Sequence, residues 1–151
     1  MDQVNISEVR LSDFSDMMEI ERLSFPEPWD IDTFLATYTD PRCKVLSARV
    51  DDAVVGYCLA TDMRDILHVL NLAVHPGFRR RGIAKKLVGE MVSYARSTAK
   101  KAVLLEVRVN NLAARSLYTS MGFRHVCTWK GYYTDTGEDA SVMIMRTGDN
   151  K

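Results

Sequence analysis

The sequence predicts an α/β fold built on a mixed β-sheet, in a single domain that spans residues 1–151. Strand-like and helical segments are interleaved along the chain. Some successive strands are joined by tight turns and others by a helix, which combines antiparallel with parallel pairing. The composition, with 46% hydrophobic and 26% charged residues, is that of an ordinary globular protein, and 151 residues is a usual size for one domain.

The N-terminal part predicts a strand followed by two short helices. Residues 4–10 alternate weakly between apolar and polar side chains, as a half-buried strand does. Ser12 is suited to cap a first helix, and Asp30 caps a second helix whose apolar side chains recur three and four residues apart. Between them, residues 25–29 read Phe-Pro-Glu-Pro-Trp, and two prolines so close together predict a stiff loop.

Three strands and a long helix follow. Residues 43–50 and 53–63 flank an acidic turn, which is typical of a β-hairpin, and residues 66–74 form the next strand. From residue 82 to about residue 99, aliphatic side chains recur with the helical period. The two lysines that come next complement the negative end of the helix dipole.

The C-terminal part predicts a strand, a helix and a closing hairpin. Residues 102–109 are rich in Val and Leu, which favour strands. Asn111 caps the next helix, and Gly122 stands where a left-handed residue commonly ends one. Residues 124–132 and 139–145 flank a polar turn and predict an antiparallel pair.

Charge and cysteine content restrict the function. Lysine plus arginine and aspartate plus glutamate number 20 each, so the chain lacks the net basic charge of a nucleic-acid or membrane-surface binder. Three distant cysteines suit neither a disulfide framework nor a zinc site, and the three histidines lack metal-ligand spacing. Neither a signal peptide nor an apolar run near the ~20 residues of a membrane span is present. We therefore expect a cytoplasmic protein with no metal, no nucleic-acid partner and no membrane partner.

A basic loop joins the strand at residues 66–74 to the helix that begins near Gly82. Backbone N–H groups without helical partners converge at the start of a helix, where the helix dipole is also positive. Gly82 and Ala84 carry little side-chain bulk, so a pyrophosphate can approach the backbone. The spacing matches neither the phosphate loop of nucleoside triphosphatases nor the dinucleotide pattern G-x-G-x-x-G. The alternative is a solvated basic turn at residues 79–81.

Glu106 and Tyr118 are the candidate reactive side chains. Period two places Glu106 and Arg108 on one face of a strand that is expected to be central, because helices precede and follow it. A carboxylate on a central strand lines a cleft or is paired; the alternative is that Glu106 and Arg108 face water together. Tyr118 lies on the apolar face of its helix, as either a core aromatic or a functional hydroxyl.

Residues 72–123 resemble the Gcn5-related N-acetyltransferase (GNAT) superfamily. Arg79, Gly82 and Ala84 reproduce the R-x-x-G-x-A form of its acetyl-coenzyme A loop, with alanine where glycine is common. The combination of Leu-Glu-Val-Arg-Val-Asn-Asn, Ala-Arg-Ser-Leu-Tyr and Gly-Phe up to residue 123 resembles the RimI-type protein N-terminal (α-amino) acetyltransferases, as does the loop at residues 25–29. The resemblance implies the GNAT fold: a mixed, mostly antiparallel central sheet in the order β-α-α-β-β-β-α-β-α-β-β, with helices on both faces.

The resemblance also implies a site. Glu106 is expected to act as general base and Tyr118 as general acid, in direct attack of an amine on the thioester within a ternary complex. Four candidate acceptor contacts flank the expected peptide path: Phe25, Glu27, Tyr132 and Tyr133. Coenzyme contacts are expected from the strand, the basic loop and one asparagine: Leu72, Ala73, Val74, Arg80, Arg81, Gly82, Ile83, Ala84, Lys85 and Asn111.

The implied activity is transfer of the acetyl group of acetyl-CoA to the α-amino group of a protein N-terminus, with a ribosomal protein as one acceptor. An α-amine, with a reference pKa of about 7.7–8.0, sheds its proton more readily than a lysine side chain at about 10.4. Glutamate, near 4.3, is a weak base, so Glu106 is expected to act through a water or with a raised pKa. Two alternatives stay open: a small amine or lysine side chain as acceptor, and a coenzyme-binding module without turnover. We expect a monomer or a weak homodimer.

Overall fold

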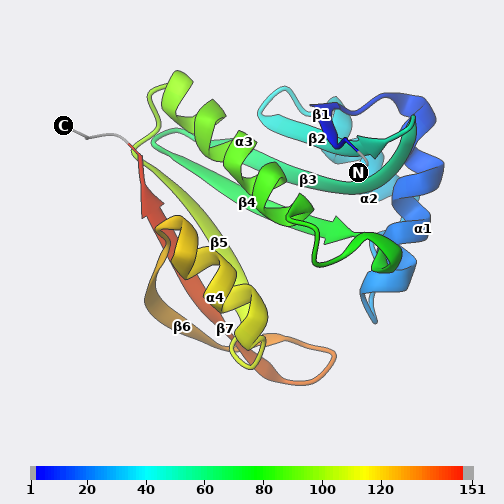
Figure 1. The fold of residues 1–151 in the computed structure, drawn as a ribbon. Helices are drawn as coiled ribbons and strands as arrows, with labels where there is room; N and C mark the ends of the chain where they lie inside the picture. The colour runs from blue at the N-terminus through cyan, green and yellow to red at the C-terminus, as the bar shows by residue number, and fades with distance from the viewer. Residues whose placement is uncertain (1–2, 148–151) are drawn as a thin grey trace.

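A computed structural model describes residues 3–147, as a seven-stranded sheet with helices on both faces (Figure 1). The strand order is β1-β2-β3-β4-β5-β7-β6. Along the chain the elements are β1 (Asn5–Glu8), η1 (Leu11–Asp13), α1 (Phe14–Ser24), α2 (Ile31–Thr39), β2 (Cys43–Val50), β3 (Ala53–Met63), β4 (Ile66–Val74), η2 (Pro76–Phe78), α3 (Ile83–Ser97), β5 (Ala102–Arg108), α4 (Leu112–Met121), β6 (Arg124–Tyr133) and β7 (Glu138–Arg146). The predicted fold class and element order are confirmed.

The sheet divides between β4 and β5. These strands are parallel and pair only from Ile66–Ala102 to His68–Leu104, whereas the other strand pairs of the described residues are antiparallel. Beyond His68, β4 continues beside β3 and β5 continues beside β7. Figure 1 shows the result: β5, β7 and β6, with α4, diverge from β4. We call β1–β4 the N-terminal half-sheet and β5–β7–β6 the C-terminal half-sheet.

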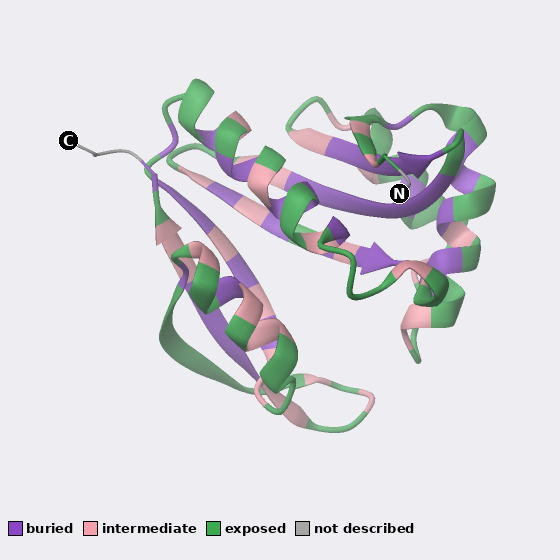
Figure 2. Cartoon of the chain, viewed as in Figure 1, coloured by how far each residue is buried: buried purple, intermediate pink, exposed green. Residues whose placement is uncertain are grey.

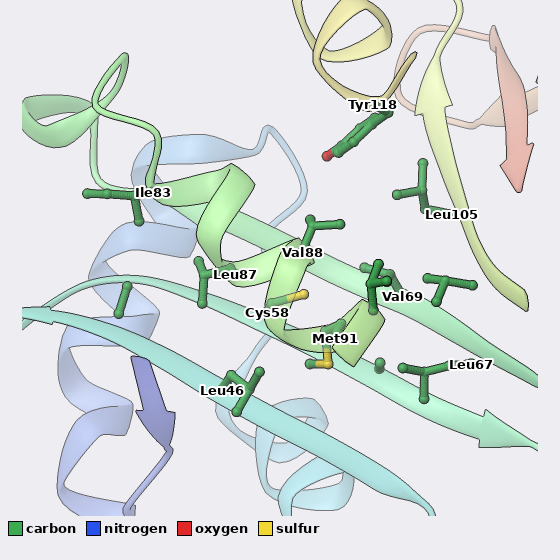
Figure 3. Packing of buried hydrophobic residues seen from close by; sticks show 14 of the residues in the cluster. Leu46, Cys58, Leu67, Val69, Ile83, Leu87, Val88, Met91, Leu105 and Tyr118 are labelled. Atoms are coloured by element: carbon green, nitrogen blue, oxygen red, sulfur yellow. The ribbon is translucent and has the colours of Figure 1, made fainter. Parts of the chain in front are cut away.

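The N-terminal half-sheet is covered on both faces. On one face α3 contributes fully buried side chains such as Leu87 and Met91, and on the other α1 and α2 contribute Met17 and Phe34 (Figure 3 shows the α3 side). At Gly56 the backbone of β3 passes close under α3. A Cβ there would lie 3.0 Å from the carbonyl oxygen of Ala73, so only glycine fits without displacement.

The C-terminal half-sheet is covered less completely. Helix α4 packs on it through Tyr118, whose ring meets that of Phe123 at 5.8 Å. Strand β6 is the outer edge and is exposed along almost all of its length (Figure 2). Register shifts at His125–Cys127 and Trp129–Tyr133 interrupt its pairing with β7. The outer strand therefore adds little to the buried core.

Most of the predicted helix ends are confirmed. The Asp30 carboxylate accepts a hydrogen bond from the backbone N–H of Thr33 at 2.9 Å, and the Asn111 side chain accepts one from Ala114 at 3.1 Å. Ser12 as the first cap is wrong, because the 3-10 turn η1 precedes α1. Asp13, 4% exposed, fixes that turn by accepting hydrogen bonds from the side chain of Arg49 and from the Arg10 N–H.

None of the helices described between residues 3 and 147 is both long and apolar enough to cross a membrane.

Candidate active site

A cavity of about 680 Å³ lies between the end of β4, the first turn of α3 and the helix α4. Its wall combines backbone-rich segments with small and apolar side chains. All the predicted coenzyme contacts except Arg81 line it: Leu72, Ala73, Val74, Arg80, Gly82, Ile83, Ala84, Lys85 and Asn111. The end of α1 closes one side through Ser24 and Phe25.

Arg81 turns away from this cavity. Its guanidinium lies over the ring of Phe78, 5.0 Å from the centroid, and it lines a second cavity with Lys86 and Val4. The sequence could not separate Arg81 from its neighbours, because the direction of each side chain depends on the handedness of the loop. Arg80, with a φ of 63°, and Gly82, with a φ of 77°, are both left-handed and reverse the chain on either side of Arg81.

The start of α3 has the geometry of an anion cradle. Gly82 caps the helix without a side chain, and the first intrahelical hydrogen bond runs from the N–H of Lys86 to the carbonyl of Gly82. The N–H groups of residues 83–85 therefore precede the helical ladder and point toward the positive end of the helix dipole. A Cβ on Gly82 would meet nothing within 4 Å, so the backbone is open on this side. These features fit a diphosphate.

Arg79 fixes the position of the basic loop through two hydrogen bonds. Its Nε donates to the carbonyl of Val74 at 2.9 Å, and one Nη donates to the hydroxyl of Ser24 at 3.1 Å. The basic loop is thereby tied both to the end of β4 and to the end of α1. The alternative of a solvated turn does not describe this residue.

Tyr118 forms part of the cavity wall from α4. Its side chain reaches from α4 toward α3 and β4, with the hydroxyl at the leading end (Figure 3). Burial raises the pKa of Tyr118, so the hydroxyl keeps its proton at neutral pH. Tyr118 therefore presents a protonated hydroxyl, able to donate a hydrogen bond, at the cavity wall.

Glu106 faces His68 across the point where the half-sheets separate. Oε2 of Glu106 lies 2.6 Å from Nε2 of His68, and the side chains are 8% and 18% exposed. His68 is the last residue of β4 that pairs with β5, and its partner there is Leu104. Glu106 lies two residues further along β5. Sequence reasoning gave His68 no catalytic position. The available signal was that His68 and Asn71 are the two polar residues of an otherwise apolar strand.

Arg108 does not pair with Glu106. It donates hydrogen bonds to both carboxylate oxygens of Asp135, at 3.2 and 2.9 Å, and to Glu138 at 3.3 Å. Its guanidinium also lies 4.1 Å from the ring centroid of Tyr133. This cluster fastens the β6–β7 turn to the end of β5.

The predicted acceptor tyrosines, Tyr132 and Tyr133, lie within electrostatic range of Glu106. Burial is the main cause that raises the pKa of Tyr133 to about 12, and the charge of Glu106 contributes. The pKa of Tyr132 is raised by burial and by the same charge. Tyr133 also raises the pKa of Tyr118, so it lies within electrostatic range of both predicted catalytic residues.

The loop at residues 25–29 divides between the cavity and the surface. Phe25 is half-buried and lines the cavity, whereas Glu27 is exposed. The structure therefore pairs Glu106 with His68 where the half-sheets separate, a place that we call the seam, and Tyr132 and Tyr133 lie within electrostatic range of Glu106. Tyr118 and the predicted coenzyme contacts other than Arg81 line the cavity. Glu27 is exposed and is not among the residues that line the cavity.

Comparison with known proteins gives consistent results. Residues 14–123 match the family model described as the acetyltransferase (GNAT) family. A [ribosomal protein bS18]-alanine N-acetyltransferase of Haemophilus ducreyi is 31% identical over 138 residues, which cover 88% of this chain and 93% of the relative. An N-alpha-acetyltransferase of Saccharolobus solfataricus is 33% identical over 147 residues, covering 89% and 87%.

Among solved structures, the ribosomal-protein-S18-alanine N-acetyltransferase from Escherichia coli superimposes with a TM-score of 0.90. It is 25% identical, and the match covers 99% of this chain and 97% of the other.

Proposed function

This chain belongs to the acetyltransferase (GNAT) family, and on that premise we propose that it transfers the acetyl group of acetyl-CoA to the α-amino group of a protein N-terminus. The observation that carries the proposal is the position of Glu106 and His68. They lie at the seam of the sheet, and Tyr133 is within electrostatic range of both Glu106 and Tyr118 in the cavity wall. On this proposal, Glu106 supplies a proton acceptor and Tyr118 a proton donor, the two groups that acyl transfer to an amine requires.

Acetyl-CoA is the cosubstrate, and it supplies the thioester that is attacked. The N–H groups at the start of α3 are the groups we assign to its diphosphate. The last residues of β4, Leu72–Val74, line the same cavity and have no β5 partner beside them. We assign these residues, together with Asn111 at the start of α4, to the rest of the coenzyme.

Glu106 is proposed as the general base, with His68 as its positioning partner. The incoming α-amine must lose a proton, and its reference pKa of about 7.7–8.0 makes this loss feasible near neutral pH. The hydrogen bond between Nε2 of His68 and Oε2 of Glu106 fixes the orientation of the carboxylate and leaves Oε1 for the amine or a bridging water.

Tyr118 is proposed as the general acid toward the leaving thiolate. Burial raises the pKa of Tyr118, which by itself makes proton release harder. The same apolar surroundings disfavour the charged thiolate, so the pKa of the leaving thiol is raised as well. Because both pKa values rise, a proton can still pass from the hydroxyl to the thiolate along the hydrogen bond between them. Attack is then direct, within a ternary complex of enzyme, acetyl-CoA and acceptor.

The acceptor is proposed to be a protein or peptide N-terminus that enters between the loop at residues 25–29 and the tyrosines of β6. Phe25, Glu27, Tyr132 and Tyr133 are assigned to contact it, and the name of the H. ducreyi relative suggests a ribosomal protein as one acceptor. We further infer a single domain over residues 1–151 and a cytoplasmic location. Monomer or weak homodimer stays a prediction.

Two matched peptide sets test the function. In one set the N-terminus is free and the lysines are blocked; in the other the N-terminus is blocked and the lysines are free. We expect mass spectrometry to find acetyl groups on the first set only. Acetylation confined to lysines, or to a small amine, would replace the proposal with the second candidate acceptor. Coenzyme binding without any transfer would indicate a binding module.

A further inference from the structure

Glu21 is a buried carboxylate that the reaction above does not use. It lies on α1 and is 1% exposed. Three neutral donors reach its side chain: the Tyr57 hydroxyl and the Asn71 amide, at 2.8 Å for the latter, both to Oε1, and the backbone N–H of Trp29 at 2.8 Å to Oε2. Removing a carboxylate from water costs several kcal/mol, and the three hydrogen bonds offset this cost. The arrangement suggests that Glu21 connects the segments from which these donors come.

The loop at residues 25–29 begins and ends on this one residue. The N–H of Phe25 donates to the backbone carbonyl of Glu21 at 3.1 Å, and the N–H of Trp29 donates to its carboxylate. Two prolines stiffen the three residues in between. Fixing both ends therefore fixes the middle, where Glu27 lies.

The other two donors connect Glu21 to the sheet beneath the coenzyme cavity. Tyr57 lies on β3 and is fully buried, and its ring packs edge-on against Phe34 at 5.8 Å. Asn71 lies on β4, next to the irregular pairing at Leu70 and directly before the cavity-lining residues 72–74. The Glu21 carboxylate thus connects the loop at residues 25–29 to β4, because it accepts hydrogen bonds from both.

We propose that Glu21 is a positioning residue for the acceptor site, which sets the distance between the loop at residues 25–29 and β4. This inference rests on the proposed function, because it assigns the loop to the acceptor. The two ends of the loop differ in their anchors. The Phe25 end is held by a backbone bond and by the Arg79–Ser24 hydrogen bond, whereas the Trp29 end depends on the Glu21 side chain. Loss of that side chain therefore releases the acceptor side and leaves the coenzyme side in place.

Steady-state kinetics with acetyl-CoA and an N-terminal peptide test this split. In Glu21→Gln the amide can still accept from Tyr57 and Asn71, but its NH₂ group then faces the N–H of Trp29. Glu21→Ala removes the acceptor whichever way a glutamine turns. We expect the peptide KM to rise about ten- to a hundredfold, as for loss of a hydrogen bond to a charged group. The KM for acetyl-CoA is expected to change less than about twofold.

Tyr57→Phe is the matched control. It removes one hydrogen bond from the same carboxylate, on the side of the sheet, and leaves the Trp29 bond intact. We expect a lower melting temperature and an unchanged peptide KM. If Tyr57→Phe raises the peptide KM as much as the Glu21 variants do, the effect is general destabilisation and the proposal is wrong.

Amide hydrogen exchange at Trp29 supplies a readout that needs no turnover. The Trp29 N–H is expected to exchange faster in Glu21→Ala than in wild type, while the N–H of Phe25 keeps its protection. Retained protection at Trp29, or lost protection with an unchanged peptide KM, would overturn the proposal. If wild type acetylates no N-terminus at all, the proposed function fails instead, and the exchange result still reports on the anchor.

Discussion

The two half-sheets are stabilised in different ways. In the N-terminal half-sheet, strands β2 and β3 are almost continuously buried between α3 on one face and α1 and α2 on the other. In the C-terminal half-sheet, β6 is exposed, and an arginine with two carboxylates fastens the β6–β7 turn. Apolar burial therefore extends through the half that contributes the proposed coenzyme cradle. In the other half it holds β5 and β7, whereas polar contacts fasten the turn beside Tyr133.

This difference places the chemistry at the boundary. Glu106 comes from β5 and His68 from β4, so the proposed base and its partner belong to different halves. The short parallel pairing from Ile66 to His68 fixes where they meet. The contrast between the halves predicts which substitutions act on the rate, which on stability and which on acceptor binding.

The largest effect is expected from Glu106→Gln, which keeps the shape of the side chain and removes its basicity. General-base catalysis contributes about 10²- to 10⁴-fold to a rate, so kcat is expected to fall by that factor. The affinity for acetyl-CoA, measured by calorimetry, is expected to stay the same, because Glu106 is not among the residues that line the coenzyme cavity. A loss of coenzyme affinity comparable to the loss of rate would show that the halves are not separable.

Leu87→Ala and Val126→Ala compare burial in the two halves. Leu87, on α3, is fully buried against the sheet, and its truncation is expected to reduce the free energy of unfolding by about 2–5 kcal/mol. Val126 is 51% exposed on β6, and its truncation is expected to cost less than about 0.5 kcal/mol. Urea unfolding of both variants measures the difference. Equal costs would contradict the contrast drawn here.

Arg108→Lys tests the polar fastening. Lysine keeps the charge but cannot form the paired hydrogen bonds to Asp135, so we expect a loss of about 1–2 kcal/mol in unfolding free energy. The peptide KM is expected to rise, because the β6–β7 turn carries Tyr133. Arg124→Lys, on the exposed β6, is the control and is expected to change neither quantity.

The smallest effect is a pH dependence of the same cluster. Hydrogen bonds from Arg108 lower the pKa of Asp135 below its usual value of 3.8. Asp135 thus has a lower pKa in the folded chain than in the unfolded chain. Between these two pKa values the unfolded chain binds more protons than the folded one, so the free energy of unfolding rises with pH in this range. The contribution of Asp135 is complete above about pH 4 and is lost as the pH falls through the folded pKa. The stability difference between wild type and Asp135→Asn should therefore shrink on acidification; a constant difference would show that the ion pair contributes nothing.

Sequence reasoning predicted the regular elements well, because they depend on short-range rules. The bounds of β2, β3 and β4 coincide with the predicted segments, and Asn111 and Gly122 begin and end α4 as expected. These features follow from side-chain period and from capping chemistry within a few residues.

Contacts between distant segments were predicted less completely. The partners of Glu106 and Arg108 depend on where β4 and β5 separate and on where the β6–β7 turn folds back, and period two within one strand contains neither fact. The direction of Arg81 depends on two left-handed residues beside it. Glu21 gave no local signal, because its three donors come from a loop and two strands.

The close approach of β3 to β4 at Gly56 affects the width of the cavity beside the end of β4. One added methyl group would lie 3.0 Å from the carbonyl oxygen of Ala73 in β4, which is too close, and at contact distance, 3.4 Å, from Ile83 and Leu87 in the first turns of α3. The end of β4, which lines the cavity assigned to the cosubstrate, would have to shift by tenths of an ångström, although Gly56 itself does not line that cavity. The width of the cavity thus depends on the absence of a side chain at Gly56, on the strand next to β4.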